Sequence, residues 1–394
     1  MEENKKNRVP NVPNLRFSVF NGEWICTSLS KISYSLEYGI GASAVDYDGQ
    51  HRYIRITDIS NYSDNERNFV SPSFLDNKAI LKEGDILLAR TGATVGDSFI
   101  FKSECDYNAY YAGFLIRARI RNNNPYFIYY QLKTYRYNKW VKIMSARSGQ
   151  PGINSQEYGS FAIYLPSIQE QDKVALLLRK IDMRIDSQNK IIEELKTLKS
   201  GLLNKLFPLK GMCKYGTEMK LVSFLNPGAK DPVNPNNYKR ISIHLNYGGL
   251  SFVDSSKELK DARPFFVRRK GELIIGKQNY FNGSVCLVEE VFDNTVCSNA
   301  IMSFSIVSIN PFYLLYSVSN KSYLKAREFN ANGTGQKELS EKAFLNFSIN
   351  VPDVKIQHAI AELIGGIEKK ILNNAKLLER FRLEKDYLLS NMFI

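Results

Sequence analysis

One stretch of sequence, PSIQEQDKVALLLRKIDMRIDSQNKIIEELKTLKSGLLNKLF at residues 166–207, decides how this chain is organised. A second stretch, PDVKIQHAIAELIGGIEKKILNNAKLLERFRLEKDYLLSNMF at residues 352–393, aligns with it without a gap. In both stretches the apolar residues recur in alternating steps of four and three. A mean step of about 3.5 residues is the seam of a coiled coil rather than the face of an ordinary surface helix. The sequence therefore predicts two long helices that are copies of each other.

The two predicted seams also match in their polar positions. Gln188 in the first corresponds to Asn374 in the second, and Lys199 corresponds to Lys385. Because both amides lie near mid-helix, antiparallel pairing places them opposite each other, where a hydrogen bond can fix the register. The same pairing places Lys199 near Glu362. The residues expected to pair around these amides are Ile181, Ile185, Ile192, Leu195, Ile367, Ile371, Leu378 and Phe381.

An alternative is that the two helices are unrelated and that each covers a separate domain. The segments before the helices argue against it, because they are related too. Residues 84–87 (GDIL) match 271–274 (GELI), and Asn124-Pro125 matches Asn310-Pro311. We therefore expect four segments: a globular domain at 1–165, a helix at 166–207, a second domain at 208–351 and a second helix at 352–394. The predicted fold class is α+β, with two similar mixed domains separated by two antiparallel coiled-coil helices and related by a pseudo-twofold axis.

Length and composition limit the possibilities. A chain of 394 residues can hold two or three domains, and its net charge of +13, carried mostly by the globular segments, suits a polyanion such as nucleic acid. No stretch is apolar enough to predict a membrane span, and the first residues lack a signal-peptide core. Five scattered cysteines without a C-x-x-C pair suit the reducing cytoplasm, and they argue against a disulfide framework or a zinc site.

Within each domain the pattern predicts mostly strands. Candidates are residues 53–60, 84–90 and 114–121 in the first domain, and residues 240–245 and 271–277 in the second. Asn-Pro then opens a predicted helix in each domain, at 125–136 and 311–324. A loop follows at 145–154 and 330–339, and a short strand leads into each long helix. In FLIRARIR (114–121) the alternation places Arg117, Arg119 and Arg121 on one face of a strand.

The signatures of catalysis are missing from this sequence. Only three histidines are present, at unrelated places, and there is no P-loop, no G-x-S-x-G elbow and no Rossmann fingerprint. The sequence NPYF (124–127) superficially resembles an amino-methyltransferase motif, but it lacks the second proline and reads as a helix start. We therefore expect no catalytic residue, no metal site and no cofactor in this chain.

Two loops in each domain carry side chains that are suited to DNA. Arg or Lys can bond guanine in the major groove, and Gln or Asn can bond adenine. The first domain offers Arg90, Thr91, Gly92, Thr94, Arg147, Ser148 and Gln150. The second offers Lys277, Gln278, Asn279, Tyr280, Asn332, Thr334 and Gln336. Further basic candidates, suited to phosphates, are Arg117, Arg119, Lys133, Arg136, Lys139, Lys142, Lys239 and Arg240. The alternatives are ordinary exposed loops and, for the aromatic stretch 133–142, a helix face in the core.

The order of several motifs resembles one known family. These motifs are VPNLRF (12–17), FNGEW (20–24), GDILLARTG (84–92), SGQPGIN (148–154) and the LP-x-x-x-x-Q entry to a helix that ends in LLNKLF. Together they are similar to the specificity subunit of type I restriction–modification enzymes, over essentially the whole chain. The second domain departs from the pattern at Lys277-Gln278-Asn279 and lacks the FNGEW run, so its base contacts stay unassigned.

The resemblance implies a subunit without catalytic activity that selects double-stranded DNA. The domains at 1–165 and 208–351 would be target-recognition domains, held apart by the two helices. The partners implied are two methylation subunits, which use S-adenosylmethionine, and restriction subunits, which use ATP and Mg²⁺. Two other functions compete with this one: a coiled-coil adaptor that does not bind DNA, and an enzyme that modifies DNA alone.

The duplication also predicts the form of the DNA target. Two domains related by a twofold axis would read two half-sites on one face of a duplex, with centres about 10 bp apart. Because the loop residues of the two domains differ, the two half-sites should differ as well. We expect a bipartite, asymmetric target with a spacer of fixed length, in a cytoplasmic protein.

Overall fold

The computed structural model describes residues 11–60, 69–103, 107–146, 150–207, 216–253, 263–328 and 338–394. The chain divides into two compact units. Unit 1 comprises residues 1–189 with 377–394, and unit 2 comprises residues 190–376.

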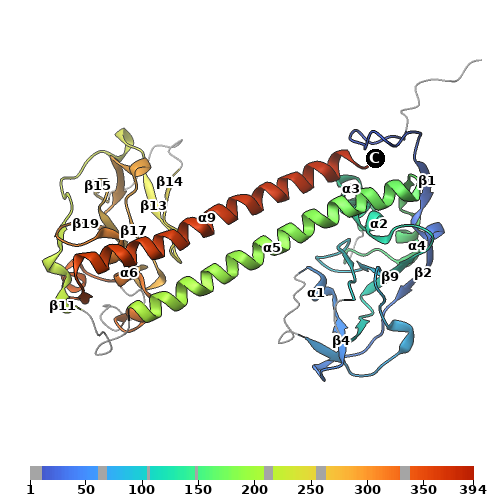
Figure 1. The fold of residues 1–394 in the computed structure, drawn as a ribbon, viewed down its shortest axis with the longest axis horizontal. Helices are drawn as coiled ribbons and strands as arrows, with labels where there is room; N and C mark the ends of the chain where they lie inside the picture. Colours follow the sequence, from blue (N-terminus) through green and yellow to red (C-terminus); the bar gives the residue numbers. More distant parts are fainter. Residues whose placement is uncertain are drawn as a thin grey trace, which may run out of the picture. The chain divides into compact units, whose positions relative to one another are not determined.

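The two predicted long helices are present. Helix α5 (Ile168–Leu206) and helix α9 (Val354–Asn391) each run without a break (Figure 1). Every residue expected in the seam is buried or half-buried, whereas Leu176, Met183 and Leu198 between the seam positions are exposed. The 3.5-residue spacing thus identified the side of each helix that packs against the protein.

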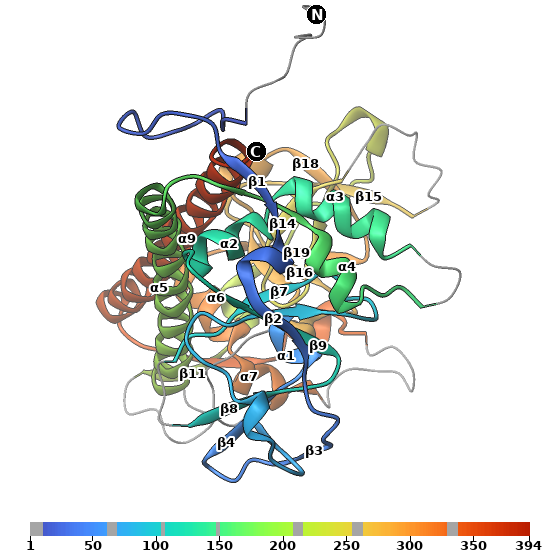
Figure 2. The same ribbon diagram turned by 90° about the vertical axis from the view of Figure 1, so that its right-hand side faces the viewer.

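Unit 1 contains a four-stranded antiparallel sheet in the order β2-β9-β6-β7. Its strands are β2 (Ser33–Tyr38), β6 (Ile86–Ala89), β7 (Ser98–Ile100) and β9 (Leu115–Ile120). Helices α2 (Pro125–Gln131), α3 (Tyr135–Met144) and α4 (Ser155–Ser160) gather around this sheet (Figure 2). Phe127 and Tyr158 from these helices share one buried cluster with Leu88 and Ile116 of the sheet.

Shorter strand pairs complete unit 1. Strand β1 (Ile25–Ser28) pairs with β10 (Ala162–Leu165), the strand that leads into α5. The other elements are β3 (Ala44–Asp46), which pairs with β5 (Val70–Pro72), β4 (His51–Ile54), which runs parallel to β8 (Asn108–Tyr111), and α1 (Ile56–Ser60). The strand predicted at 53–60 therefore ends at Ile54, and a helical turn follows it.

Unit 2 repeats the four-stranded sheet of unit 1 and the strand pair that leads into the long helix. Its four-stranded sheet has the equivalent order β12-β19-β16-β17, formed by β12 (Leu225–Pro227), β16 (Leu273–Gly276), β17 (Val285–Leu287) and β19 (Ile301–Ile306). Strand β11 (Thr217–Lys220) pairs with β20 (Ser348–Val351), as β1 pairs with β10. The remaining elements are β13 (Ile241–Ile243), β14 (Leu250–Phe252), β15 (Phe265–Arg268), β18 (Thr295–Ser298), α6 (Pro311–Ser319), α7 (Lys321–Lys325) and α8 (Glu341–Leu345).

The helices predicted at 125–136 and 311–324 are each broken in two. In unit 1, α2 ends at Gln131 and the Thr134 side chain accepts the N–H of Tyr137 to begin α3. In unit 2, Asn320 separates α6 from α7, because its side chain accepts the N–H of Ser322 at 2.8 Å. Both residues cap a new helix, which competes with continuing the old one.

Within each unit the two long helices run antiparallel. In unit 1, Ile181 in the first half of α5 packs in one cluster with Leu388 near the end of α9, and Arg184 lies 5.6 Å from the Phe381 ring centroid. In unit 2, Phe207 at the end of α5 shares a cluster with Ile360 near the start of α9. These pairings confirm the predicted direction.

Each seam lysine binds a carboxylate that also accepts a hydrogen bond from a tyrosine hydroxyl. In unit 1, Asp182 accepts from Lys385 Nζ at 2.6 Å and from the Tyr130 hydroxyl at 2.7 Å. In unit 2, Glu368 accepts from Lys199 Nζ at 2.6 Å and from the Tyr316 hydroxyl at 2.7 Å. The prediction that Lys199 lies near Glu362 is therefore wrong. Its partner is the acid that the Tyr316 hydroxyl already fixes in place.

The two amides have different local environments. Asn374 Nδ2 donates to the Lys370 carbonyl of its own helix at 2.8 Å. Gln188 Oε1 is buried and has no partner among the described residues. The two residues belong to different units, so the proposed amide–amide pairing stays a prediction.

Candidate nucleic-acid interface

In unit 1 two loops that were predicted separately lie side by side. The Arg90 carbonyl accepts the N–H of Ile153 at 2.9 Å, and the N–H of Gly92 donates to the Pro151 carbonyl at 3.3 Å. A bridge also joins Thr91 to Gly152. Backbone hydrogen bonds thus gather the end of β6 and the loop before α4 into one surface that carries Arg90, Thr91 and the exposed Gln150.

The Arg90 side chain is held in a defined position. Its guanidinium lies 4.8 Å from the Tyr38 ring centroid, and Nη1 donates to the Gly113 carbonyl at 3.4 Å. Phe114 follows Gly113 in the chain, accepts the Arg90 N–H at its carbonyl and is 60% exposed. The turn that follows requires glycine, because Gly96 has a φ of +92° and an added Cβ would lie 2.4 Å from Val141 Cγ1. Thr94 is half-buried in this turn.

Helix α3 presents two of the predicted lysines to solvent. Lys139 and Lys142 are exposed one turn apart. Tyr135 and Ile143 extend the same face and are 77% and 65% exposed. An exposed helix face of this composition can contact phosphates and sugars without reading sequence.

Two other candidates from this stretch point inward, so their assignment as phosphate contacts is corrected. Lys133 Nζ donates to the Ser98 carbonyl at 2.6 Å, and burial lowers the pKa of this amine to about 8. Arg136 donates to the Ala162 carbonyl at 2.8 Å and stacks 4.6 Å from the Phe161 ring centroid; burial lowers its pKa too. Their charged groups lie over aromatic rings, and the inward direction of both side chains agrees with the alternative of a helix face in the core.

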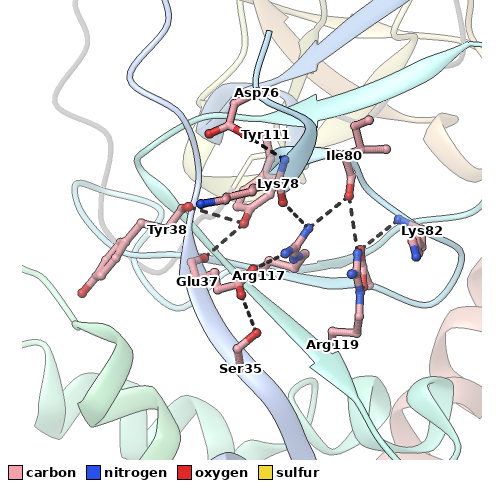
Figure 3. A network of polar contacts seen from close by, with 11 residues as sticks. Ser35, Glu37, Tyr38, Asp76, Lys78, Ile80, Lys82, Tyr111, Arg117 and Arg119 are labelled. Atoms are coloured by element: carbon pink, nitrogen blue, oxygen red, sulfur yellow. Dashed lines mark hydrogen bonds and ion pairs between the residues drawn. The ribbon is translucent and has the colours of Figure 1, made fainter.

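Arg117 and Arg119 do share one face of β9, but residues 78–85 cover that face (Figure 3). Arg117 is 4% exposed, forms an ion pair with Glu37 and donates to the carbonyls of Lys78 and Ile80 at 3.0 Å each. Arg119 binds Asp85 at 2.7 Å. The expectation that these two guanidinium groups face DNA is therefore corrected, because Arg117 is buried and both groups bind acceptors within the protein.

In unit 2 four of the predicted residues line a hollow. Its volume is about 330 Å³, and its walls include Arg240, Lys277, Gln278 and Asn279 together with Arg263 and Phe265. Among the described residues that line it, three are cationic and none is acidic. A concave, positively charged site with amide side chains in its walls suits a part of a nucleic acid.

Lys277 occupies the place in unit 2 that Arg90 occupies in unit 1. The N–H of Lys277 donates to the Ala300 carbonyl at 3.0 Å and its carbonyl accepts from Leu339 at 3.0 Å. Arg90 makes the equivalent hydrogen bonds with Phe114 and Ile153. The two sites are therefore built on the same backbone frame and differ in their side chains.

The remaining candidates have separate outcomes. Tyr280 is fully buried and its hydroxyl donates to the Val318 carbonyl at 2.7 Å, so its assignment to DNA is corrected. Lys239 is exposed, with Nζ 5.3 Å from the Phe252 ring centroid, whereas Arg240 is buried in the wall of the hollow. Arg147, Ser148, Asn332, Thr334 and Gln336 lie outside the described residues.

Sequence reasoning missed Tyr38 and Arg263. Tyr38 ends β2 and is distant in sequence from Arg90, which it contacts. No local motif marks either residue, and only the fold brings them to the two sites.

Among the described residues, no group of three or more His, Cys, Asp or Glu side chains is arranged to hold a metal ion. None of the described helices combines the length and the apolar character needed to cross a membrane.

The chain was compared with known proteins. It is 22% identical over 336 residues to the type I restriction enzyme MjaVIII specificity subunit of Methanocaldococcus jannaschii, a match over 78% of this chain and 77% of that protein. It is 25% identical over 328 residues to the putative type I restriction enzyme MjaX specificity subunit of the same organism, over 77% and 75% of the two chains. Its fold is similar to that of a type I restriction–modification S subunit from M. genitalium, with a TM-score of 0.67 at 16% identity, covering 97% of this chain and 99% of the other.

A family model settles the relationship. The model of the type I restriction modification DNA specificity domain matches residues 42–197 and again residues 204–380. These two matches cover most of the chain and fall on its two repeats. The chain therefore belongs to the family of type I restriction–modification DNA specificity domains and carries two of them.

Proposed function

We propose that each of the two domains reads one half of a bipartite, asymmetric target in double-stranded DNA. The observation that supports this most directly is the equivalence of Arg90 and Lys277. Arg90 directly follows β6 and Lys277 directly follows β16, which are equivalent strands of the two repeated sheets. The backbone hydrogen bonds of the two residues are equivalent, whereas the side chains around them differ. Equivalent frames with unlike side chains are suited to reading two unlike half-sites.

We further propose that the chain is a non-catalytic subunit of a cytoplasmic complex. Its partners would be two methylation subunits that use S-adenosylmethionine, and restriction subunits that use ATP and Mg²⁺. Exposed apolar residues on the long helices support a docking role for them: Leu176, Met183 and Leu198 on α5, and Leu363, Leu372, Leu383 and Tyr387 on α9. Exposed apolar side chains repeated along a helix are typical of a surface that another chain covers.

The target is tested by mapping methylated positions across a genome, in cells that express this chain with its methylation partners. We expect a bipartite motif with two different halves and a spacer of one length. A continuous or palindromic motif, or a spacer that varies, would contradict the proposal. A coiled-coil adaptor would give no sequence preference at all.

The assignment of the second half-site is tested by replacing Lys277, Gln278 and Asn279 together with alanine. Recognition of one half of the motif should be relaxed or lost, because these side chains line the hollow of unit 2. The matched control is Lys270→Ala, which removes an exposed lysine of the same unit that pairs with Glu290 outside the hollow. Loss of both halves in the triple variant, or an equal effect of Lys270→Ala, would count against the assignment.

A further inference from the structure

The Arg90 site contains an aromatic residue that no motif marks. Tyr38 is the last residue of β2, and its ring lies under the Arg90 guanidinium, 4.8 Å from centroid to Cζ. An arginine reads guanine through two parallel hydrogen bonds, which require its planar group to be held at a set angle. A flat ring under the guanidinium restricts that angle, and it does so without using any of the five N–H donors.

Tyr38 is itself held at its hydroxyl and at its backbone. Its hydroxyl accepts the N–H of Ser155, the first residue of α4, at 3.1 Å. Its backbone carbonyl accepts from the Tyr111 hydroxyl at 3.4 Å, and Tyr111 in turn lies against Arg117. Figure 3 shows the Tyr38 ring directed away from Arg117, as strand alternation requires when the neighbouring Glu37 faces Arg117.

This arrangement gives the buried Arg117 network a role in the site. The network anchors the end of β2 from the inner face of the sheet, through Glu37 and the Tyr111 hydroxyl. Tyr38 then projects from the anchored strand toward Arg90. Gly113 contributes a carbonyl acceptor for Nη1 at 3.4 Å, so the guanidinium is oriented by a ring and by one hydrogen bond.

We infer that Tyr38 is a positioning residue that sets the base preference of Arg90 in the half-site read by the first domain. The ligand is the guanine edge of one base pair, and Tyr38 acts through Arg90 rather than on the DNA. This inference rests on the proposed function. A residue that only orients another should change discrimination between bases more than it changes overall affinity.

The experiment uses the complex of the full chain with its methylation partners and the motif mapped for it. Competition binding compares that motif with duplexes changed at single positions, for the wild type, Tyr38→Leu, Tyr38→Phe and Arg90→Gln. Arg90→Gln identifies the position that Arg90 reads. We expect Tyr38→Leu to lower base preference at that same position by about threefold to thirtyfold, the range set by loss of one cation–ring contact.

Tyr38→Phe keeps the ring and should retain most of the preference. The preference in the other half-site, read through Lys277, and the salt dependence of binding should be unchanged in both Tyr38 variants. The inference would be overturned if Tyr38→Leu lost affinity equally for every duplex. It would also be overturned if Tyr38→Leu kept the wild-type base preference at the position where Arg90→Gln changes it. If the wild-type complex itself shows no sequence preference, the proposed function fails instead.

Discussion

At the scale of single residues, the direction in which a cation points decides what it can do. Lys139 faces solvent, while Lys133, six residues earlier, faces the core and donates to the Ser98 carbonyl. The two look equivalent in the basic, aromatic stretch that carries them. Only one can reach a phosphate, and the other carries a cost of desolvation that shows in its lowered pKa.

That cost predicts how stability depends on pH. The ordinary pKa of lysine is 10.5 and burial lowers that of Lys133 to about 8. Between these values the unfolded chain binds the proton more readily than the folded chain, so the Lys133 contribution to the free energy of unfolding rises with pH. The free energy of unfolding is measured with urea for the wild type and for Lys133→Met at about pH 7.5 and about pH 9.5. On going from the lower to the higher pH, the wild type should gain stability relative to the variant. A difference that stays constant with pH would show that the amine is not desolvated.

At the scale of elements, α3 provides a charged outer face on a helix whose inner face is aromatic. Tyr137 on the inner side is buried and its hydroxyl donates to the Gly96 carbonyl at 2.8 Å, which fixes the helix against the β6–β7 turn. Lys139 and Lys142 are thereby held on a helix that packs against the turn after Arg90. Rigid placement of lysines favours backbone contacts that set the register of a protein on DNA.

If these contacts form, Lys139→Ala and Lys142→Ala should each lower the salt dependence of DNA binding by about one counterion. Affinity should fall about equally for all sequences, because phosphates carry no sequence information. Titrations at several salt concentrations measure the slope. Lys133→Met is the control, since it removes the same charge from an inward position. A slope that is unchanged in both surface variants would remove α3 from the interface.

At the scale of the whole molecule, one chain carries two repeats, and each unit holds its own segment of both long helices. In each unit a tyrosine of the domain and a lysine of one long helix meet on an acid of the other, as Tyr130 and Lys385 meet on Asp182. This contact fastens each domain to its helix pair. Apolar side chains such as Leu176 and Leu372 stay exposed on those helices.

A charge reversal on an exposed face of these helices should therefore weaken assembly. We expect Lys190→Glu, at an exposed position of α5, to reduce co-purification of the methylation partners more than the triple alanine variant at 277–279 does. A charge reversal at Arg179 would be harder to interpret, because it would also remove the contact of the guanidinium with the Tyr126 ring, 4.0 Å from the ring centroid. Unchanged co-purification would contradict docking at this position.

The purified chain alone should transfer no methyl group from labelled S-adenosylmethionine. Methyl transfer by the chain alone would contradict its non-catalytic role.

The sequence by itself determined the duplication, the two long helices and the face of each that packs. Those features are local and periodic: a 3.5-residue step selects one side of a helix wherever that helix lies. The sequence also located the frames of Arg90 and Lys277, because each follows a short apolar strand that opens with a glycine turn. All of these features depend on residues that are neighbours along the chain.

Only the tertiary structure decided which cations remain accessible. Alternation places Arg117 and Arg119 on one face of β9, but it cannot say that residues 78–85 fold back over that face. The same limit applies to Tyr38, which lies 52 residues before the Arg90 it supports. Burial and stacking depend on contacts between distant segments, and a single sequence carries no periodic trace of such contacts. For that reason the two loops beside Arg90 could each be proposed from the sequence, while their meeting in one site could not.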